Sequence, residues 1–151
     1  MKVCFSGTFN VLHKGHKHLI EKAIQIAGED GKVYIGISKG DLLKNKKFKK
    51  PVSERIQNLK TFLSMKGYDD RVEIKIITDK FGPAITGDYD AIITSPETKE
   101  NAIKINEKRV ELDNKPLEII EIPYILAEDG KKISSTRILD HEIDEEGKKI
   151  S

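Results

Sequence analysis

The chain has 151 residues, a formal net charge of +2, 37% hydrophobic residues and 34% charged residues. This length fits one domain with a core of its own, so we expect residues 1–151 to form a single unit. The composition excludes a disordered chain, and the low net charge disfavours a protein that coats nucleic acid.

The single cysteine, Cys4, excludes an internal disulfide, and its place in an apolar stretch predicts a buried, inert thiol. No apolar run is long enough to span a membrane. The first residues enter a strand directly instead of forming a signal peptide. We therefore expect a cytoplasmic protein without membrane contact.

The first third of the chain predicts a strand–helix–strand unit. An apolar strand at Val3–Phe5 leads into a turn at Ser6–Thr8. A helix follows over Lys14–Ala27, where apolar residues recur at helical spacing and Gly28 ends the pattern. The next strand, Val33–Ile37, is continuously apolar, as expected for a strand that is buried on both faces.

A lysine-rich run, residues 39–50, separates this unit from the next helix, and it holds six lysines in twelve residues. We expect Ser53 to cap a helix over Glu54–Lys66, with a third strand at Arg71–Ile77. Lysines of such a run are most often solvated, so Lys49 and Lys50 are interpreted in that way.

The second half repeats the alternation of strands and helices. The predicted elements are a helical turn at Phe81–Ile85, a strand at Ala91–Thr94, a helix at Thr98–Asp113, a strand at Leu117–Ile122, and a loop with a last helix within residues 130–147. In the long helix we expect Ala102, Ile105 and Val110 to face inward.

This alternation predicts an α/β fold, a single Rossmann-like domain with an open five-stranded parallel sheet and helices on both faces. In such a sheet, ligands bind at the carboxyl ends of the strands. The turns at Ser6–Thr8, Ser38–Lys39 and Thr94–Pro96 all lie at that edge. We therefore expect the functional residues there.

The stretch from Lys2 to His18 is the strongest candidate site. A strand, a glycine turn and a helix start present unpaired N–H groups and the positive end of a helix dipole, which together favour an anion. His13 and His16 lie three residues apart, on one face of the helix, and each can donate a hydrogen bond to a phosphate oxygen. Gly15 leaves room for a ligand to approach. A plain capped helix and a histidine metal site are the alternatives.

Two motifs carry a resemblance to a known superfamily. The run from Ser6 to His16, SGTFNVLHKGH, resembles the GTFDxLHxGH signature of nucleotidyltransferases related to class I aminoacyl-tRNA synthetases. The run from Ile133 to Ile138, ISSTRI, is similar to their second signature, ISSTxI. Asn10 departs from the usual aspartate, and Ser6 stands where glycine is common.

The middle of the chain resembles one branch of that superfamily. This branch comprises the archaeal phosphopantetheine adenylyltransferases and the matching domain of eukaryotic coenzyme A synthase. The stretches that resemble its sequences are Asp41–Lys46, Thr94–Thr98, Ala102–Asn106 and Arg109. The resemblance implies transfer of AMP from ATP to 4′-phosphopantetheine, with Mg2+ on the triphosphate. An FAD synthetase or a polyol-phosphate cytidylyltransferase is the alternative within the superfamily.

The resemblance also implies roles for individual residues. His16 would contact the α-phosphate and the leaving phosphates with His13 beside it, and Thr8 would place a phosphate. The other implied site residues are Lys44 and Lys46 near the reacting phosphates, Ser134, Ser135 and Thr136 on the β- and γ-phosphates, and Ser6, Gly7, Phe9, Gly15, Ser95, Glu97, Arg109 and Arg137 around the substrates.

A third hypothesis is a nucleotide-sensing or RNA-binding module that uses the lysine run. The low net charge and the 6% aromatic content weigh against RNA. We therefore expect ATP and 4′-phosphopantetheine as partners, no nucleic acid and no obligate protein partner.

Overall fold

The computed structural model describes residues 1–39, 50–79 and 81–150, so Lys44 and Lys46 lie outside the described residues.

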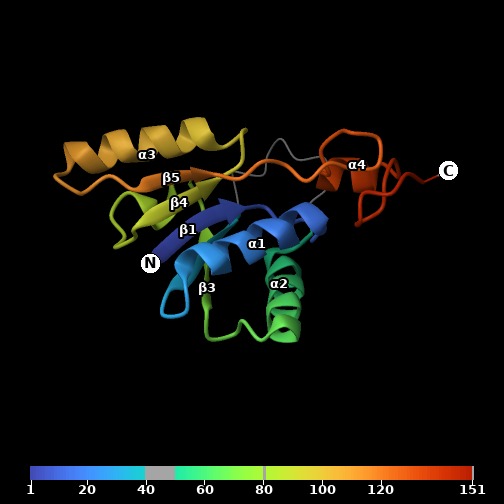
Figure 1. Cartoon of the computed structure of the whole chain (residues 1–151), viewed down its shortest axis with the longest axis horizontal. Helices are drawn as coiled ribbons and strands as arrows, with labels where there is room; N and C mark the ends of the chain where they lie inside the picture. The colour runs from blue at the N-terminus through green and yellow to red at the C-terminus, as the bar shows by residue number, and fades with distance from the viewer. Residues whose placement is uncertain (40–49, 80, 151) are drawn as a thin grey trace.

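Five parallel strands form one sheet in the order β3-β2-β1-β4-β5 (Figure 1). The strands are β1 Lys2–Gly7, β2 Lys32–Ser38, β3 Val72–Ile77, β4 Ala91–Thr94 and β5 Glu118–Glu121. The helices are α1 Lys14–Ala27, α2 Val52–Lys66, α3 Lys99–Glu111 and α4 Ser135–Leu139, with a 3-10 turn η2 at Gly82–Ala84. The predicted fold is confirmed.

Alternating residues of the central strands supply the two faces of the sheet. Val3 and Phe5 of β1 belong to the larger core, which α1 and α2 cover. Cys4, between them, packs in a second core beneath α3 and η2. Because strand side chains alternate between faces, one apolar strand serves both cores. Burial raises the pKa of the Cys4 thiol to about 12, which keeps it protonated.

Two expectations about the helices are wrong. α2 begins at Val52, with Pro51 rather than Ser53 at its N-cap. The fixed φ of proline suits a helix start, and its carbonyl accepts hydrogen bonds from Glu54 and Arg55. In α3, Val110 is 58% exposed, whereas the neighbouring Arg109 is buried. Carbonyl partners for the guanidinium decide that orientation, and the hydrophobic pattern does not contain them.

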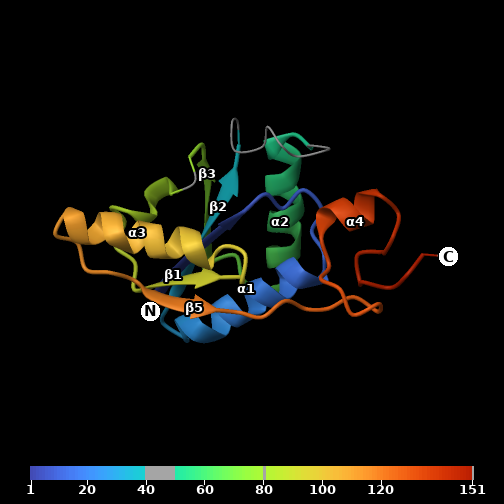
Figure 2. The ribbon, with the colours of Figure 1, turned by 90° about the horizontal axis from the view of Figure 1, so that it is seen from above.

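The C-terminal segment with α4 lies beside the start of α1, at the carboxyl edge of the sheet (Figures 1 and 2). Two contacts hold it there. The Ser135 hydroxyl forms hydrogen bonds with the main chain of Val11. The Lys14 N–H donates a hydrogen bond to the Glu145 carbonyl at 2.9 Å. The two signature motifs, 124 residues apart, therefore face one cleft.

None of the helices in the described ranges combines the length and the apolar content that crossing a bilayer requires.

Candidate active site

A cleft of about 960 Å³ opens at the carboxyl edge of the sheet, large enough for a nucleotide. It lies between the loop after β1, the start of α1, the end of β4 and the C-terminal segment. Twelve of the residues predicted for the site line it: Ser6, Gly7, Thr8, Phe9, His13, Gly15, His16, Ser95, Glu97, Ser134, Ser135 and Thr136. The structure thus brings both signatures to one cavity.

His13 is the N-cap of α1. Its Nδ1 accepts hydrogen bonds from the N–H groups of Gly15 at 3.0 Å and His16 at 3.3 Å. An imidazole nitrogen that accepts carries no proton, so in the neutral ring the proton lies on Nε2. The cap therefore fixes the tautomer and leaves an Nε2–H donor at the helix mouth.

His16 packs between two other rings. Its ring stacks on His13 with centroids 3.8 Å apart and lies 4.8 Å from the ring of Phe9. Its Nδ1 is 3.4 Å from the His13 N–H, which closes a reciprocal capping box. With Nδ1 as the acceptor, the proton of the neutral His16 ring lies on Nε2, and the neighbouring rings hold the imidazole in place.

Both histidines are neutral at pH 7. Burial lowers the pKa of His13 to about 4, and the nearby Lys17 adds to the effect. Burial also lowers the pKa of His16 to about 3, with a smaller contribution from His13, whereas a hydrogen bond with the Val11 main chain acts in the opposite direction. The pair therefore offers two neutral N–H donors rather than two cations in the protein without ligand.

These pKa values predict how stability depends on pH. A histidine titrates near 6.5 in the unfolded chain, so below that pH the unfolded state binds more protons than the folded state. Stability should then fall as the pH decreases from about 6.5 towards 4. We expect the midpoint of thermal unfolding to fall less steeply over this range in His13→Asn, because asparagine keeps the N-cap acceptor and does not titrate. His141→Asn, in an exposed turn, is the control. Equal slopes in all three proteins would contradict the assignment.

Gly15 has a second reason to be glycine, beside the approach of a ligand inferred from the sequence. A Cβ at this position would lie 2.9 Å from Cε1 and 3.0 Å from Nδ1 of His13. The residue thus leaves room for the His13 ring.

The hydroxyls of the second motif are not equivalent. Ser135 donates to the Val11 carbonyl and accepts from the Val11 N–H, both at 3.3 Å, so its proton is engaged. Ser134 is the N-cap of α4 and accepts from the Arg137 N–H at 3.2 Å. That contact does not use the Ser134 proton, which makes Ser134 the better donor to a phosphate.

Arg109 and Arg137, both predicted to contact substrate, do not line the cleft. The Arg109 guanidinium donates to four main-chain carbonyls, those of Ala84, Ile85, Gly87 and Lys115. Arg137 donates to the Lys132 carbonyl and pairs with Asp129, and this contact lowers the pKa of the Asp129 carboxyl. Both side chains brace loops beside the site.

Asn10, the departure from the first signature, is buried at the cleft, and its Oδ1 accepts from the Lys50 N–H at 2.8 Å. The side chain thus ties the loop after β1 to the chain entering α2. This anchoring needs an acceptor and not a negative charge, so asparagine suffices.

The sequence reading missed Lys132. It is the one lysine or arginine among the described residues that line the cleft. Its Nζ lies 3.0 Å from Glu97 and 5.1 Å from the centroid of the Tyr124 ring, and the Tyr124 hydroxyl donates to the same carboxylate at 3.2 Å. The available signal was its position one residue before the second signature.

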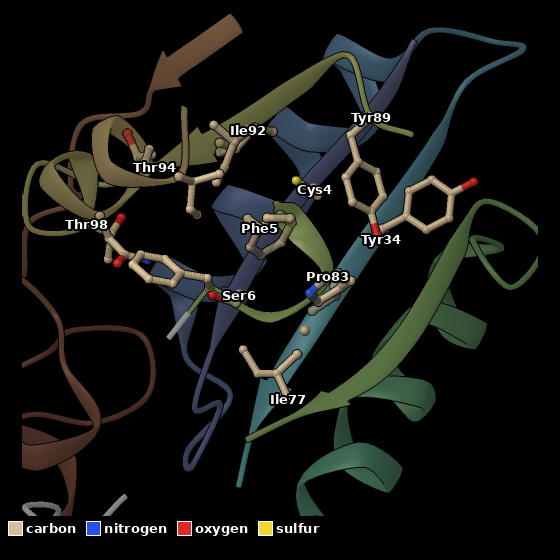
Figure 3. Close-up of a pocket in the computed structure, with 18 of the residues that line it drawn as sticks. Cys4, Phe5, Ser6, Tyr34, Ile77, Pro83, Tyr89, Ile92, Thr94 and Thr98 are labelled. Atoms are coloured by element: carbon tan, nitrogen blue, oxygen red, sulfur yellow. The ribbon is translucent and has the colours of Figure 1, made fainter. Parts of the chain in front are cut away.

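A second, narrower cavity of about 80 Å³ lies under α3 and η2 (Figure 3). Tyr34 and Tyr89 lie together at one end, and Thr94 and Thr98 lie at the other (Figure 3). Ser6, Ile93 and Thr98 line both this cavity and the cleft, so the two spaces meet at the end of β1.

This fold and this cleft define a nucleotidyltransferase of the superfamily with the HxGH motif, and the cytidylyltransferase-like family model matches residues 4–141. Curated relatives narrow the class. The phosphopantetheine adenylyltransferase of Methanosarcina acetivorans is 45% identical over 97% of this chain and 94% of its own. That of Archaeoglobus fulgidus is 41% identical over 97% of this chain and 98% of its own. The chain belongs to the phosphopantetheine adenylyltransferase family.

A solved structure of a protein of unknown function from Archaeoglobus fulgidus has the same fold. Its TM-score is 0.72 at 36% identity, over 81% of this chain and 89% of that one.

Proposed function

We propose that the protein transfers AMP from ATP to 4′-phosphopantetheine and releases dephospho-coenzyme A and pyrophosphate. The observation that supports this most strongly is that both signature motifs of the family face one cleft. The similarity to the adenylyltransferase relatives extends over nearly the whole length of both chains, which agrees with this proposal. We further propose that residues 1–151 act as one nucleotidyltransferase domain in the cytoplasm.

The reaction requires positioning more than acid–base chemistry. A phosphate oxygen of phosphopantetheine forms a bond to the α-phosphorus of ATP. The bond between the α-phosphorus and the oxygen that bridges to the β-phosphorus breaks, and its electron pair leaves with pyrophosphate. The nucleophile is already an anion, so the protein need not supply a base. It must bring two polyanions into line and stabilise the charge around phosphorus.

His16 and His13 suit this task because their Nε2–H groups are neutral donors fixed at a helix N-terminus. Donors that already point at the developing charge need no reorganisation during the reaction. Their low pKa values keep both rings neutral at pH 7 in the protein without ligand. We assign His16 to the α-phosphate and leaving-group oxygens, with His13 and Thr8 beside it.

We assign Lys132 and Ser134 to the β- and γ-phosphates. A triphosphate would compete with Glu97 for the Lys132 ammonium, and the exposed Glu97 pair is weak enough to yield. Thr136 and the predicted Lys44 and Lys46 remain candidates for the same phosphates. The described residues include no group of three potential metal ligands among histidine, cysteine and carboxylates. A divalent ion, which we expect to be Mg2+, would therefore be held mostly by triphosphate oxygens.

The narrower cavity suits the pantetheine arm, which is a slender chain with two amides. Its walls are largely apolar, and it begins at Ser6, next to the phosphate site. The buried Thr94 hydroxyl has no hydrogen-bond partner in the described part of the chain. Unpaired buried hydroxyls are costly, so we assign an amide of the pantetheine arm as the partner of this one.

Thr94→Val tests this acceptor site. Valine keeps the shape of threonine and removes the hydroxyl, so KM for phosphopantetheine should rise about tenfold, as expected for one lost hydrogen bond. KM for ATP should stay the same. The midpoint of thermal unfolding should stay the same or rise slightly. Thr61→Val, on the exposed face of α2, is the control. An unchanged KM for phosphopantetheine would show that the Thr94 hydroxyl does not bind the pantetheine arm.

The function itself is tested with ATP, Mg2+ and 4′-phosphopantetheine, with dephospho-coenzyme A and pyrophosphate as the measured products. No product there, with product from riboflavin phosphate and ATP or from a polyol phosphate and CTP, would favour the other nucleotidyltransferases. Salt-dependent RNA binding without release of pyrophosphate would favour the binding module.

A further inference from the structure

Arg55 is a buried cation in the first turn of α2, and it lies behind the cleft rather than in it. Its side chain is among the fully buried ones, with 2% exposure. Nε donates to the Lys50 carbonyl at 2.9 Å, and Nη1 donates to the carbonyls of Thr8 at 2.9 Å and Ser38 at 2.7 Å. Burying a charge costs free energy, so the presence of an arginine at this buried position of α2 calls for an explanation.

The three carbonyls come from three different segments. Thr8 lies in the loop after β1, Ser38 ends β2, and Lys50 precedes α2. A planar guanidinium has five N–H donors in a fixed fork and can hold several carbonyls in set directions, which the single ammonium of lysine cannot do. Arg55 therefore fixes the loop after β1 against the end of β2.

This contact also sets the direction of the Thr8–Phe9 peptide. The peptide is trans, so the Phe9 N–H points away from the carbonyl that Arg55 holds. Phe9 has φ 52°, in the left-handed region, which is unfavourable for a residue other than glycine. The surroundings must hold this conformation.

The position of Phe9 in turn supports His16. The Phe9 ring is buried and lies 4.8 Å from the His16 ring. A Cβ on Gly7 would come within 3.0 Å of the Phe9 ring, so this side of the ring is also filled closely. A rotation of the Thr8–Phe9 peptide would therefore move the surface on which His16 rests.

We propose that Arg55 is a positioning residue of the phosphate site. By holding the Thr8 carbonyl it keeps Phe9 in the left-handed conformation, directs the Phe9 N–H to the anion side of the loop, and holds His16 against Phe9 and His13. The consequence for turnover rests on the proposed function, whereas the consequence for His16 concerns the free protein alone.

The test compares Arg55→Lys, which keeps the charge, and Arg55→Met, which keeps only the bulk, with the parent protein. In the free protein, NMR of the His16 ring protons reports the ring currents of Phe9 and His13. We expect these resonances to move in both variants. In the assay, kcat should fall by about tenfold in Arg55→Lys, because a misplaced catalytic group lowers the rate steeply. KM should change less than kcat.

Arg71→Met is the matched control. Arg71 also donates to main-chain carbonyls, those of Gly28 and Gly31, but at the opposite edge of the sheet. We expect it to lower the midpoint of thermal unfolding while leaving the His16 resonances and kcat in place. A purely structural role for Arg55 would give the same result as this control.

Unmoved His16 resonances in folded Arg55→Lys would overturn the inference, whether or not the protein makes dephospho-coenzyme A. An Arg55→Lys protein that does not fold would overturn it as well, since Arg55 would then serve folding first. Absence of product from the parent protein would count against the proposed function only, because the NMR comparison needs no substrate.

Discussion

Replacing His16 with alanine should lower kcat by about a hundredfold or more, the effect of losing one transition-state donor. The Nε2–H of His16 is held between the rings of His13 and Phe9, with centroids 3.8 and 4.8 Å away. Such a donor acts on the charge that develops around the α-phosphorus, so kcat should fall more than KM rises. Steady-state rates of pyrophosphate release, at saturating ATP and phosphopantetheine, measure the effect.

The fold should tolerate this change. The hydrogen bond from the His13 N–H to His16 is long, at 3.4 Å, and alanine is the best helix former. His16→Asn keeps an N–H donor on a shorter side chain, so it should retain more activity than His16→Ala. His141→Asn, in the exposed turn after α4, is the control for removing an imidazole, because asparagine tolerates the φ of 62° at this position. A folded His16→Ala protein with near-normal kcat would remove His16 from the reacting centre.

The sequence was sufficient where structure depends on local patterns. The bounds of α1 match the prediction at both ends, because apolar residues at helical spacing and Gly28 mark them. The apolar run at Val33–Ile37 identified a strand buried on both faces, and β2 lies one place from the centre of the sheet. The parallel sheet and its functional edge follow from such strands alternating with helices.

Long-range partners explain most of what the sequence did not predict. Arg109 looks like a substrate contact in the sequence, but three of its carbonyl partners lie 22 to 25 residues away in the chain. Arg55 carries no motif signal, and its role depends on Thr8, 47 residues earlier. A cation that binds main-chain carbonyls leaves no pattern in the identities of its partners.

Lys132 shows the same difficulty at the cleft. Its neighbours Glu97 and Tyr124 come from the loop before α3 and the segment after β5, so no spacing in the sequence links the three. Gly15 was recognised as part of a motif, yet the closeness of its Cα to the His13 ring is a distance that only coordinates give. The composition of the site was therefore more predictable than the tasks of its members.

Gly15→Ala should lower kcat by about tenfold to a hundredfold although it improves helix propensity. In an ordinary helix interior this change stabilises by up to about 1 kcal/mol. Here the new Cβ would lie 2.9 Å from Cε1 of the His13 ring, which stacks on His16. The ring must shift, which disturbs the N-cap contacts at 3.0 and 3.3 Å and redirects its Nε2–H. Displacements of this size cost rates of that order.

A double-mutant cycle separates the collision with His13 from other effects of the new methyl group. In the His13→Asn background no ring opposes the Cβ, and the smaller asparagine still caps α1. Gly15→Ala should then raise the free energy of unfolding, as alanine does elsewhere, and Gln25→Ala at an exposed position of α1 calibrates the method on this helix. The coupling between the two sites should be about 1–2 kcal/mol, within the range for residues in contact. Additive effects, or a Gly15→Ala enzyme with unchanged kcat, would show that the glycine serves the ligand and not the histidine.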